Sequence, residues 1–294
     1  MTIPTIHGSI LAVCVAVFPI AAQATGGTGK PVTDSIIWNT TLGDALKVAS
    51  DSSRYTVANF YTDWCKWCKI QDESTFTDSR VIAMTRRFVF ARINAEVDTL
   101  NARKYGVNGY PTVIIFDKSG VEVDRLIGYL RPEEFVRTVD EYLEGIGTKA
   151  AIEAESREKP QDWKLRYALG EKHIGRGEFE QARSQFLQIM TSDPKNGSGV
   201  ADKAMFDLAV LNRKEKNWYK AIEGFRKFIK EFPKSKLRED AETYIPWLYS
   251  KAGDTKQALK YYQAFLKSFS GSSQSDWVKE QIKLLENPPD SSSS

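Results

Sequence analysis

Two cysteines three residues apart, Cys65 and Cys68, are the residues in this chain best suited to chemistry. They follow an apolar, strand-like stretch and open a segment with helical spacing. Both therefore lie on one face of a first helical turn, where they can close a small disulfide. A helix N-terminus favours the thiolate of Cys65, and Lys66 and Lys69 add positive charge. The pattern predicts a thiol–disulfide centre with Cys65 as nucleophile, Cys68 as resolving cysteine and Lys66 as activating charge.

The other readings of the pair are half of a zinc site and an inert structural staple. A zinc site usually needs four ligands, and beyond the N-terminal segment the chain offers no third cysteine and only His173. A staple of this spacing closes too small a loop to add much stability. We expect no metal and no cofactor other than the Cys65–Cys68 disulfide, and we expect His173 to be a surface or packing residue.

Composition limits the class of protein. The 294 residues suffice for two domains, and 41% hydrophobic with 27% charged residues is typical of a folded, soluble chain. The net charge is only +3. A basic run at 213–238 has glutamates interleaved at helical spacing, which indicates a solvated helix face. We therefore expect no nucleic-acid partner.

Residues 1–24 have the pattern of an export signal, with an apolar run at 10–22 and the small-x-small end Ala22-Gln23-Ala24. The run is shorter than the about 20 apolar residues that span a bilayer. Cleavage after Ala24 would give a periplasmic or secreted protein that keeps only two cysteines. A lipoprotein anchored through Cys14 is the less favoured alternative, because Val13 is bulky where a small residue is needed.

Hydrophobic spacing predicts a first domain at 36–145, after a flexible leader at 25–35. The expected elements alternate between helices and short, buried strands. Helices are expected at 41–49, from the cysteines to about 76, at 100–105 and at 132–143, and strands at 55–61, 88–94, 112–116 and 121–126.

This order, with the Cys-x-x-Cys after the first long strand, resembles the α/β thioredoxin fold, a central mixed sheet flanked by helices. A second match is Gly109-Tyr110-Pro111-Thr112, before the third strand. The resemblance implies a cis Tyr110–Pro111 bond facing the disulfide. It also implies that Tyr110, Pro111 and Thr112 bind substrate.

Within that superfamily, the sequence is most similar to the C-terminal thioredoxin-like domain of DsbD-type thiol:disulfide interchange proteins. The similarity is carried by residues 60–65, Cys68-Lys69 and residues 74–78. Trp64 and Trp67, beside the cysteines, are then expected to shield the sulfurs and contact substrate. One residue departs from the thioredoxin pattern: Asn59 stands where many thioredoxins have a buried aspartate. Asp72, one turn beyond Cys68, is the alternative candidate for proton transfer, and a solvated carboxylate is the competing interpretation.

A repeat follows a small, polar segment at 146–160 that suits a linker or a helical bridge. Three segments, 177–182, 216–221 and 253–258, superimpose with spacings of 39 and 37 residues and end at Ala182, Ala221 and Ala258. The pattern resembles tetratricopeptide (TPR) repeats, an all-α solenoid of helical hairpins. We expect this domain at 161–286, with a closing helix at 276–285 and a disordered tail at 287–294.

Together these features predict a periplasmic protein-disulfide reductase whose TPR domain recruits a protein partner. Its substrates would be proteins with disulfides, and a membrane or periplasmic donor would supply electrons. Two alternatives stay open: an envelope scaffold with a weakly active thioredoxin-like domain, and a disulfide oxidase or isomerase. The direction of electron flow depends on a reduction potential that the residues do not fix.

Overall fold

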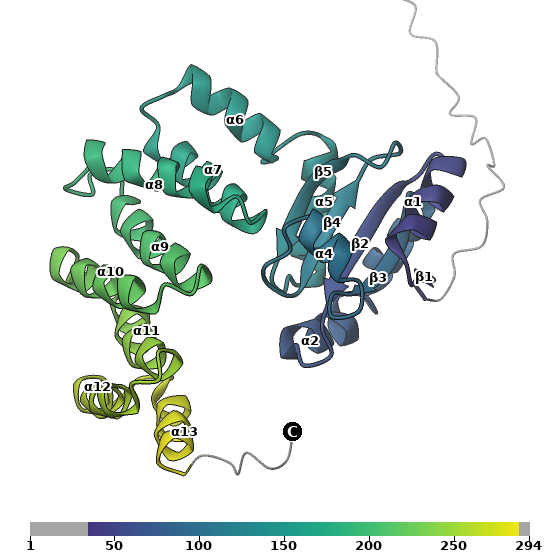
Figure 1. Ribbon diagram of the computed structural model, residues 1–294. Coiled ribbons are helices and arrows are strands. Elements are labelled where there is room, and N and C mark those ends of the chain that lie inside the picture. Colours follow the sequence, from purple (N-terminus) through teal and green to yellow (C-terminus); the bar gives the residue numbers. More distant parts are fainter. Residues whose placement is uncertain (1–34, 288–294) are drawn as a thin grey trace, which may run out of the picture. The chain divides into compact units, whose positions relative to one another are not determined.

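The computed structural model describes residues 35–287 (Figure 1). The expected export signal, nearly all of the leader and the tail beyond Asn287 lie outside the described residues. The first half of the described chain is a five-stranded sheet with helices on both faces. Its strands are β1 (Trp38–Asn39), β2 (Tyr55–Tyr61), β3 (Phe88–Asn94), β4 (Thr112–Phe116) and β5 (Glu122–Ile127). Its helices are α1 (Leu42–Asp51), α2 (Lys66–Ser74), α3 (Ser79–Ala83), α4 (Thr99–Lys104) and α5 (Pro132–Leu143), with a short 3₁₀ turn η1 (Met84–Arg86).

The sheet is mixed, with strand order β1-β3-β2-β4-β5. β3 runs parallel to both β1 and β2, whereas β4 is antiparallel to β2 and to β5. β2 is therefore central, and Ala58 on it lies opposite Ala91 of β3 and Ile114 of β4. Its carboxyl end delivers the chain directly to the cysteines at the start of α2.

Alternation along the strands builds a core on each face of the sheet. Ala58, Phe60 and Ile114 pack with the buried side of α1. Val57 and Val113, which point to the opposite face, pack with Phe135 and Val139 of α5. Strands buried on both faces need nearly continuous apolar sequence, which is why β2, β3 and β4 have the bounds that their composition predicts.

The second half of the described chain is all helix. It contains α6 (Lys149–Glu158), α7 (Trp163–Gly175), α8 (Phe179–Ser192), α9 (Ala201–Lys214), α10 (Trp218–Glu231), α11 (Arg238–Lys251), α12 (Thr255–Ser268) and α13 (Ser275–Glu286). α6 occupies the segment for which a linker or a helical bridge was expected. The pairs α7–α8, α9–α10 and α11–α12 are the three hairpins, and α13 is the closing helix. Pro246 lies inside α11, which continues on both sides of it.

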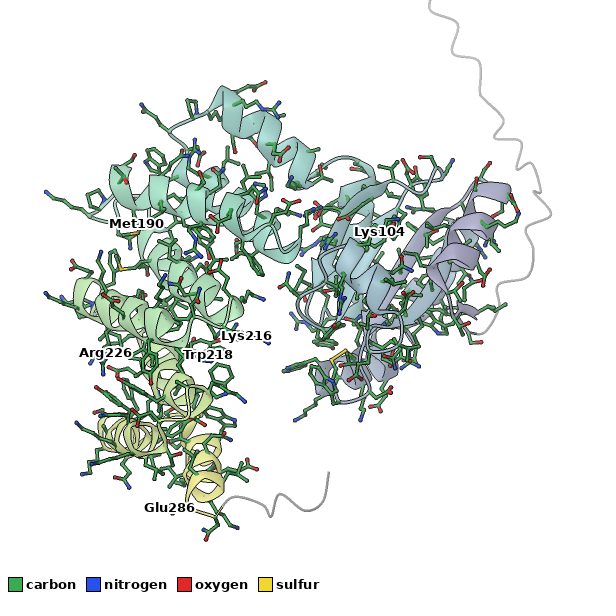
Figure 2. All side chains as sticks on the ribbon, in the orientation of Figure 1. Lys104, Met190, Lys216, Trp218, Arg226 and Glu286 are labelled. Atoms are coloured by element: carbon green, nitrogen blue, oxygen red, sulfur yellow. A yellow bond between two sulfur atoms is a disulfide. The ribbon has the colours of Figure 1, made fainter. Side chains whose placement is uncertain are left out.

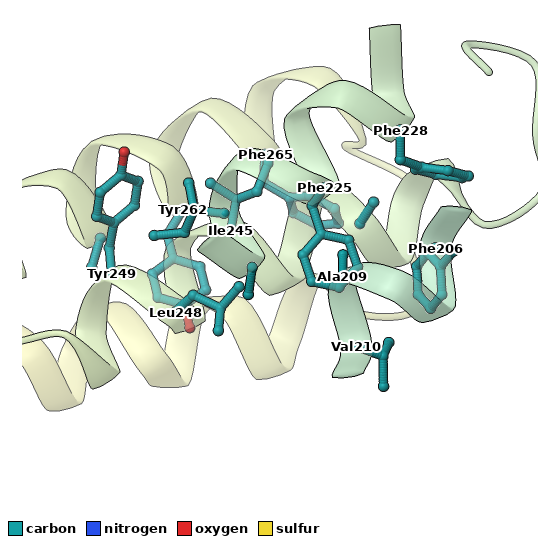
Figure 3. Packing of buried hydrophobic residues seen from close by; sticks show 14 of the residues in the cluster. Phe206, Ala209, Val210, Phe225, Phe228, Ile245, Leu248, Tyr249, Tyr262 and Phe265 are labelled. Atoms are coloured by element: carbon teal, nitrogen blue, oxygen red, sulfur yellow. The ribbon is translucent and has the colours of Figure 1, made fainter. Parts of the chain in front are cut away.

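The repeated alanines have no exposed surface, and neither do Phe186, Phe225 and Tyr262, which follow them by four residues. Figure 3 shows the core of the second and third hairpins, where Phe225, Tyr262 and Phe265 belong to one cluster with Phe206 and Ile245. Each alanine and the aromatic residue four positions later lie on the same face of their helix, and their burial shows that this face is turned toward the core. The described residues belong to one compact unit. Within residues 35–287 no helix combines the length and hydrophobicity needed to cross a membrane.

Candidate active site

Cys65 and Cys68 form a disulfide at the start of α2, with a sulfur–sulfur distance of 2.11 Å and Cα atoms 5.3 Å apart (Figure 2). Cys65 is the N-cap residue of α2, and its Sγ accepts a hydrogen bond from the Cys68 backbone N–H at 3.1 Å. Both side chains are buried. Because the helix N-terminus presents its free N–H groups to Cys65, this sulfur is the one whose thiolate the backbone stabilises after reduction.

Two exposed tryptophans flank the disulfide. The exposed fractions are 69% for Trp64 and 55% for Trp67, which is unusual for so large an apolar side chain. Trp64 packs edge-to-face on Tyr110 and donates its Nε1–H to Glu96 at 2.9 Å. Trp67 stacks on Tyr129 with ring centroids 5.8 Å apart. The two indoles are thus held by partners on other elements and present apolar surface beside the cysteines.

The loop before β4 carries the other expected substrate contacts. The Tyr110–Pro111 peptide bond is cis. Thr112 is buried as the first residue of β4, and its hydroxyl donates to the Gly109 carbonyl at 2.8 Å. Burial raises the pKa of the Tyr110 hydroxyl, with a smaller contribution from the charge of Glu96. Through the Trp64–Tyr110 contact, the structure brings this loop and the start of α2 together.

Asp72 and Asn59 bear on proton transfer. Asp72 is half-buried and pairs with Arg92 on β3 at 2.6 Å. Burial raises its pKa although the charge of Arg92 opposes the shift. Asn59, on β2, is fully buried, and within residues 35–287 neither its side-chain oxygen nor its nitrogen has a hydrogen-bond partner. The carboxyl group expected at this position in many thioredoxins is thus replaced by a neutral, unpaired amide.

Lys66 is the first residue of α2 and is exposed, so its charge lies at the helix end that carries the disulfide. His173 is buried on α7 and hydrogen-bonds through Nδ1 to Glu178, in agreement with a packing role. Among the residues that the structure describes, no group of three or more His, Cys, Asp or Glu side chains is placed to hold a metal ion.

Four residues near the site have roles that the sequence did not reveal: Glu96, Tyr129, Asn108 and Lys214. Glu96 and Tyr129 hold the two tryptophans, and the last two connect the loop before Pro111 to α9. Each contact joins residues at least 32 positions apart, so local spacing carries no signal for it. The sequence gives one indication of a role for Asn108, which is its position two residues before Tyr110.

Comparisons with known proteins find matches to two parts of the chain. Residues 42–143 match the family model described as a thioredoxin-like domain, and residues 203–235 and 247–272 match a tetratricopeptide repeat. A thiol:disulfide interchange protein DsbD from Ralstonia nicotianae is 31% identical over 33% of this chain and 17% of its own length. Human protein disulfide-isomerase A6 is 34% identical over 31% of this chain and 21% of its own. A thioredoxin from Thermus thermophilus, 27% identical, aligns with 36% of this chain and 86% of its own, with a TM-score of 0.34.

The chain thus spans less than a quarter of the length of these curated relatives, and the similarity to them is confined to about a third of the chain. The matched segment runs from the start of α1 to the end of α5, so it contains the disulfide and the loop before β4. The repeat matches fall on the helical half. Residues 42–143 are therefore a thioredoxin-like domain with a Cys-x-x-Cys disulfide, and in this chain that domain is joined to tetratricopeptide repeats.

Proposed function

We propose that this protein is a periplasmic thiol:disulfide oxidoreductase that reduces disulfides of substrate proteins. The observation that carries the proposal is the position of Cys65, the N-cap residue of α2, bonded to Cys68 within a thioredoxin-like domain. A sulfur at a helix N-terminus is stabilised as a thiolate, which is the nucleophile of disulfide exchange.

In the proposed reaction the reduced enzyme donates two electrons. The Cys65 thiolate attacks one sulfur of the substrate disulfide, so that a Cys65–substrate bond forms and the second substrate sulfur leaves as a thiolate. The Cys68 thiol then loses its proton and attacks the Cys65 sulfur. The Cys65–Cys68 bond forms, the mixed disulfide breaks and the first substrate sulfur is released. Substrate thiolates take up protons from solvent or from a nearby acid.

Asp72 is our candidate for that acid. The raised pKa of its carboxyl group supports the assignment, because a carboxyl group that holds its proton more tightly exchanges it closer to neutral pH. Its ion pair with Arg92 supports the competing structural interpretation. Asp72→Asn separates the two: loss of proton transfer shifts the pH profile of kcat, whereas a structural role changes thermal stability alone.

Substrate would bind along the loop before β4. An extended peptide can pair with the backbone of Tyr110 as a short added strand. The exposed faces of Trp64 and Trp67 then cover the peptide on either side of the reacting cysteine. The two indoles need no large rearrangement to contact a peptide, because they already pack on Tyr110 and Tyr129.

We further propose that the protein acts in the periplasm, where a membrane or periplasmic dithiol protein re-reduces the Cys65–Cys68 disulfide. Similarity to DsbD proteins supports this placement. The reducing direction is part of the proposal and rests on the same resemblance. Lys66 does not set this direction, because a charge that favours the thiolate stabilises the reduced form of the protein. The alternative is a disulfide oxidase or isomerase, and the reduction potential of the Cys65–Cys68 pair distinguishes an oxidant from a reductant.

The helical repeats would recruit a protein partner. A cavity of about 400 Å³ opens between α9, α11 and α13, lined by Phe206, Tyr244, Trp247 and Trp277 together with Asp240 and Gln274. An aromatic lining with a few polar groups is typical of a binding site for a polypeptide side chain. This observation also favours the scaffold alternative, in which partner binding is the main activity.

Insulin reduction by the full chain, followed by turbidity with dithiothreitol as donor, tests the proposal. Cys65→Ser should abolish the catalysed rate, because the attacking sulfur is gone. Cys68→Ser that has been reduced, freed of dithiothreitol and then mixed with insulin should accumulate mixed disulfides that resist boiling but not reductant, because resolution is blocked. Undiminished activity of Cys65→Ser would exclude the mechanism.

The doubly substituted Cys65→Ser, Cys68→Ser protein separates the reductase from the scaffold. Partners held through the repeats should remain bound to it in a pull-down, while partners held through mixed disulfides should be lost. A wild-type protein that binds partners but does not accelerate insulin reduction would establish the scaffold in place of the reductase.

A further inference from the structure

We propose that Lys214, on α9 of the repeats, and Asn108, in the loop before Pro111, are positioning residues that hold the substrate-binding loop of the oxidoreductase. The repeats are then part of the substrate-binding face of the enzyme as well as a docking module. The inference rests on the proposed function, which supplies the substrate and the role of Tyr110.

The contact between the two side chains is direct. Lys214 donates from Nζ to Asn108 Oδ1 at 2.6 Å and lies 3.4 Å from the Asn108 backbone oxygen. The Asn108 amide nitrogen donates to the Ile174 carbonyl of α7 at 2.8 Å and to the Gly106 carbonyl at 3.0 Å. The Asn108 side chain therefore accepts a hydrogen bond from α9 through its oxygen and donates one to α7 through its nitrogen.

Lys214 has no competing ion pair. Within residues 35–287, no carboxylate lies within ion-pair distance of its ammonium group, and Asn108 provides its side-chain acceptor. Burial, with a smaller contribution from the charge of Arg213, lowers its pKa to about 8. Such a cation is costly to bury unless its hydrogen bonds are made. The hydrogen bond to Asn108 offsets part of this cost, and it forms only while the loop keeps its observed position.

A second set of contacts fixes the same loop from its other end. Arg125 of β5 donates from Nη1 to the Tyr105 carbonyl at 2.6 Å and to the Gly175 carbonyl of α7 at 3.0 Å. Gly106 lies so close to α7 that a Cβ atom there would be 1.9 Å from the Arg176 carbonyl oxygen. The loop is therefore held between the sheet and the repeats at Tyr105, Gly106 and Asn108.

The held segment leads straight into the site. Gly109, which follows Asn108, accepts the hydrogen bond from Thr112 that closes the turn. Tyr110, the next residue, packs on Trp64 and provides the backbone on which we place substrate. A displacement of Asn108 is transmitted through two peptide units to that backbone. Asn108 contacts neither cysteine sulfur, so its displacement should weaken the binding of a polypeptide more than it slows disulfide exchange.

Kinetics with two disulfides of different size test this assignment. Insulin carries a polypeptide that can lie on the loop, whereas hydroxyethyl disulfide has none. For Lys214→Met we expect the ratio of kcat/KM for insulin to kcat/KM for hydroxyethyl disulfide to fall about tenfold, mainly through KM, as for loss of a charged hydrogen bond. Lys214→Arg should restore most of the ratio, because a guanidinium can donate to Asn108.

The matched control is Lys220→Met, since Lys220 is an exposed lysine of α10. It should leave the ratio at the wild-type value. Asn108→Ala should lower the ratio at least as much as Lys214→Met, because it also removes the hydrogen bonds to Ile174 and Gly106. Adding Lys214→Met to Asn108→Ala should change the ratio little further, since the contact between the two side chains is already gone. Thermal melts of each full-length variant establish that it is folded.

The outcomes separate the inference from the function on which it rests. A wild-type enzyme that reduces both disulfides, with an unchanged ratio in Lys214→Met, refutes the positioning role and leaves the reductase intact. A wild-type enzyme that reduces neither disulfide refutes the proposed function. Equal losses on both disulfides in Lys214→Met also refute positioning, because they indicate a general effect on the fold.

Discussion

Asp124 on β5 and Lys172 on α7 form an ion pair of 2.7 Å in which the carboxylate has no exposed surface. The same carboxylate accepts from Arg176 at 2.7 Å and from the backbone N–H of Lys149 at 2.7 Å. Burial opposes its ionisation, but the charges of Lys172 and Arg176 outweigh this, so its pKa lies below the ordinary value. One side chain of the thioredoxin-like domain thereby satisfies three donors from the helical half.

Asp124→Asn should therefore destabilise the protein strongly. It leaves the charges of Lys172 and Arg176 without their anion, and removing one partner of a buried ion pair costs about 3 kcal/mol or more. Urea unfolding measures the loss. Asp51→Asn, which breaks an exposed pair with Lys47, is the control and should change the midpoint little.

The effect of Asp124 should also depend on pH. Its folded-state pKa is lowered, so its contribution is fully present well above the ordinary value of 3.8 and is lost as the pH falls through the folded-state value. The stability difference between wild type and Asp124→Asn should shrink in acid. A difference that stays constant down to low pH would show that the substitution acts through packing alone.

Asp207 on α9 predicts the opposite pH dependence. Burial raises its pKa to about 6, although the Tyr167 hydroxyl and the charge of Lys203 favour the ionised form. A raised pKa means that stability is lost as the pH rises from about 4 to about 6. Asp207→Asn should thus be more stable than wild type at pH 7.5, by up to about 3 kcal/mol.

That difference should nearly vanish near pH 3.5, where the carboxyl group is protonated in the folded state and mostly protonated in the unfolded state. Urea unfolding at the two pH values measures it. The control is Asp276→Asn, which replaces an exposed aspartate of α13. If Asp207→Asn were less stable than wild type at both pH values, the Tyr167 hydrogen bond would outweigh the cost of the buried charge, against the prediction.

Substituting alanine for two helical glycines should change the stability of the protein in opposite directions. A Cβ added at Gly170 of α7 would lie 2.3 Å from a ring carbon of Phe186, whereas one added at Gly43 of α1 would have no heavy atom within 4 Å. Gly170→Ala should lower stability by about 1–3 kcal/mol through overpacking. Gly43→Ala should raise it by about 0.5–1 kcal/mol, the usual gain in a helix. Thermal unfolding compares them, and equal effects would contradict the packing described for α7 and α8.

Much of the first domain could be predicted because its strands are buried on both faces. β2, β3, β4 and α5 begin and end where the apolar runs and Pro132 place them. The short α3 and the turn η1 were missed, because too few residues carry a helical period. On α2, the polar Gln71 is buried together with Cys68, whereas the apolar Ile70 is only partly buried. Apolarity alone does not identify the inner face of a two-turn helix.

The candidate site was also predicted only in part. The disulfide and the loop at 109–112 were predicted from motifs, and the repeats from an internal period. The burial of Asp124 and Arg125 on β5 was not predicted. These charged side chains are buried because partners lie on α7, about 50 positions away in the sequence. Only the folded chain reveals such pairings.

The reduction potential of Cys65–Cys68 tests the central claim most directly. The full chain is equilibrated with thiol–disulfide buffers of known potential, and the free thiols are then labelled and counted. A reductant should give a value of about −250 mV or lower, in the range of thioredoxin. A value of about −130 mV, in the range of strong oxidants, would contradict the assignment as a reductase.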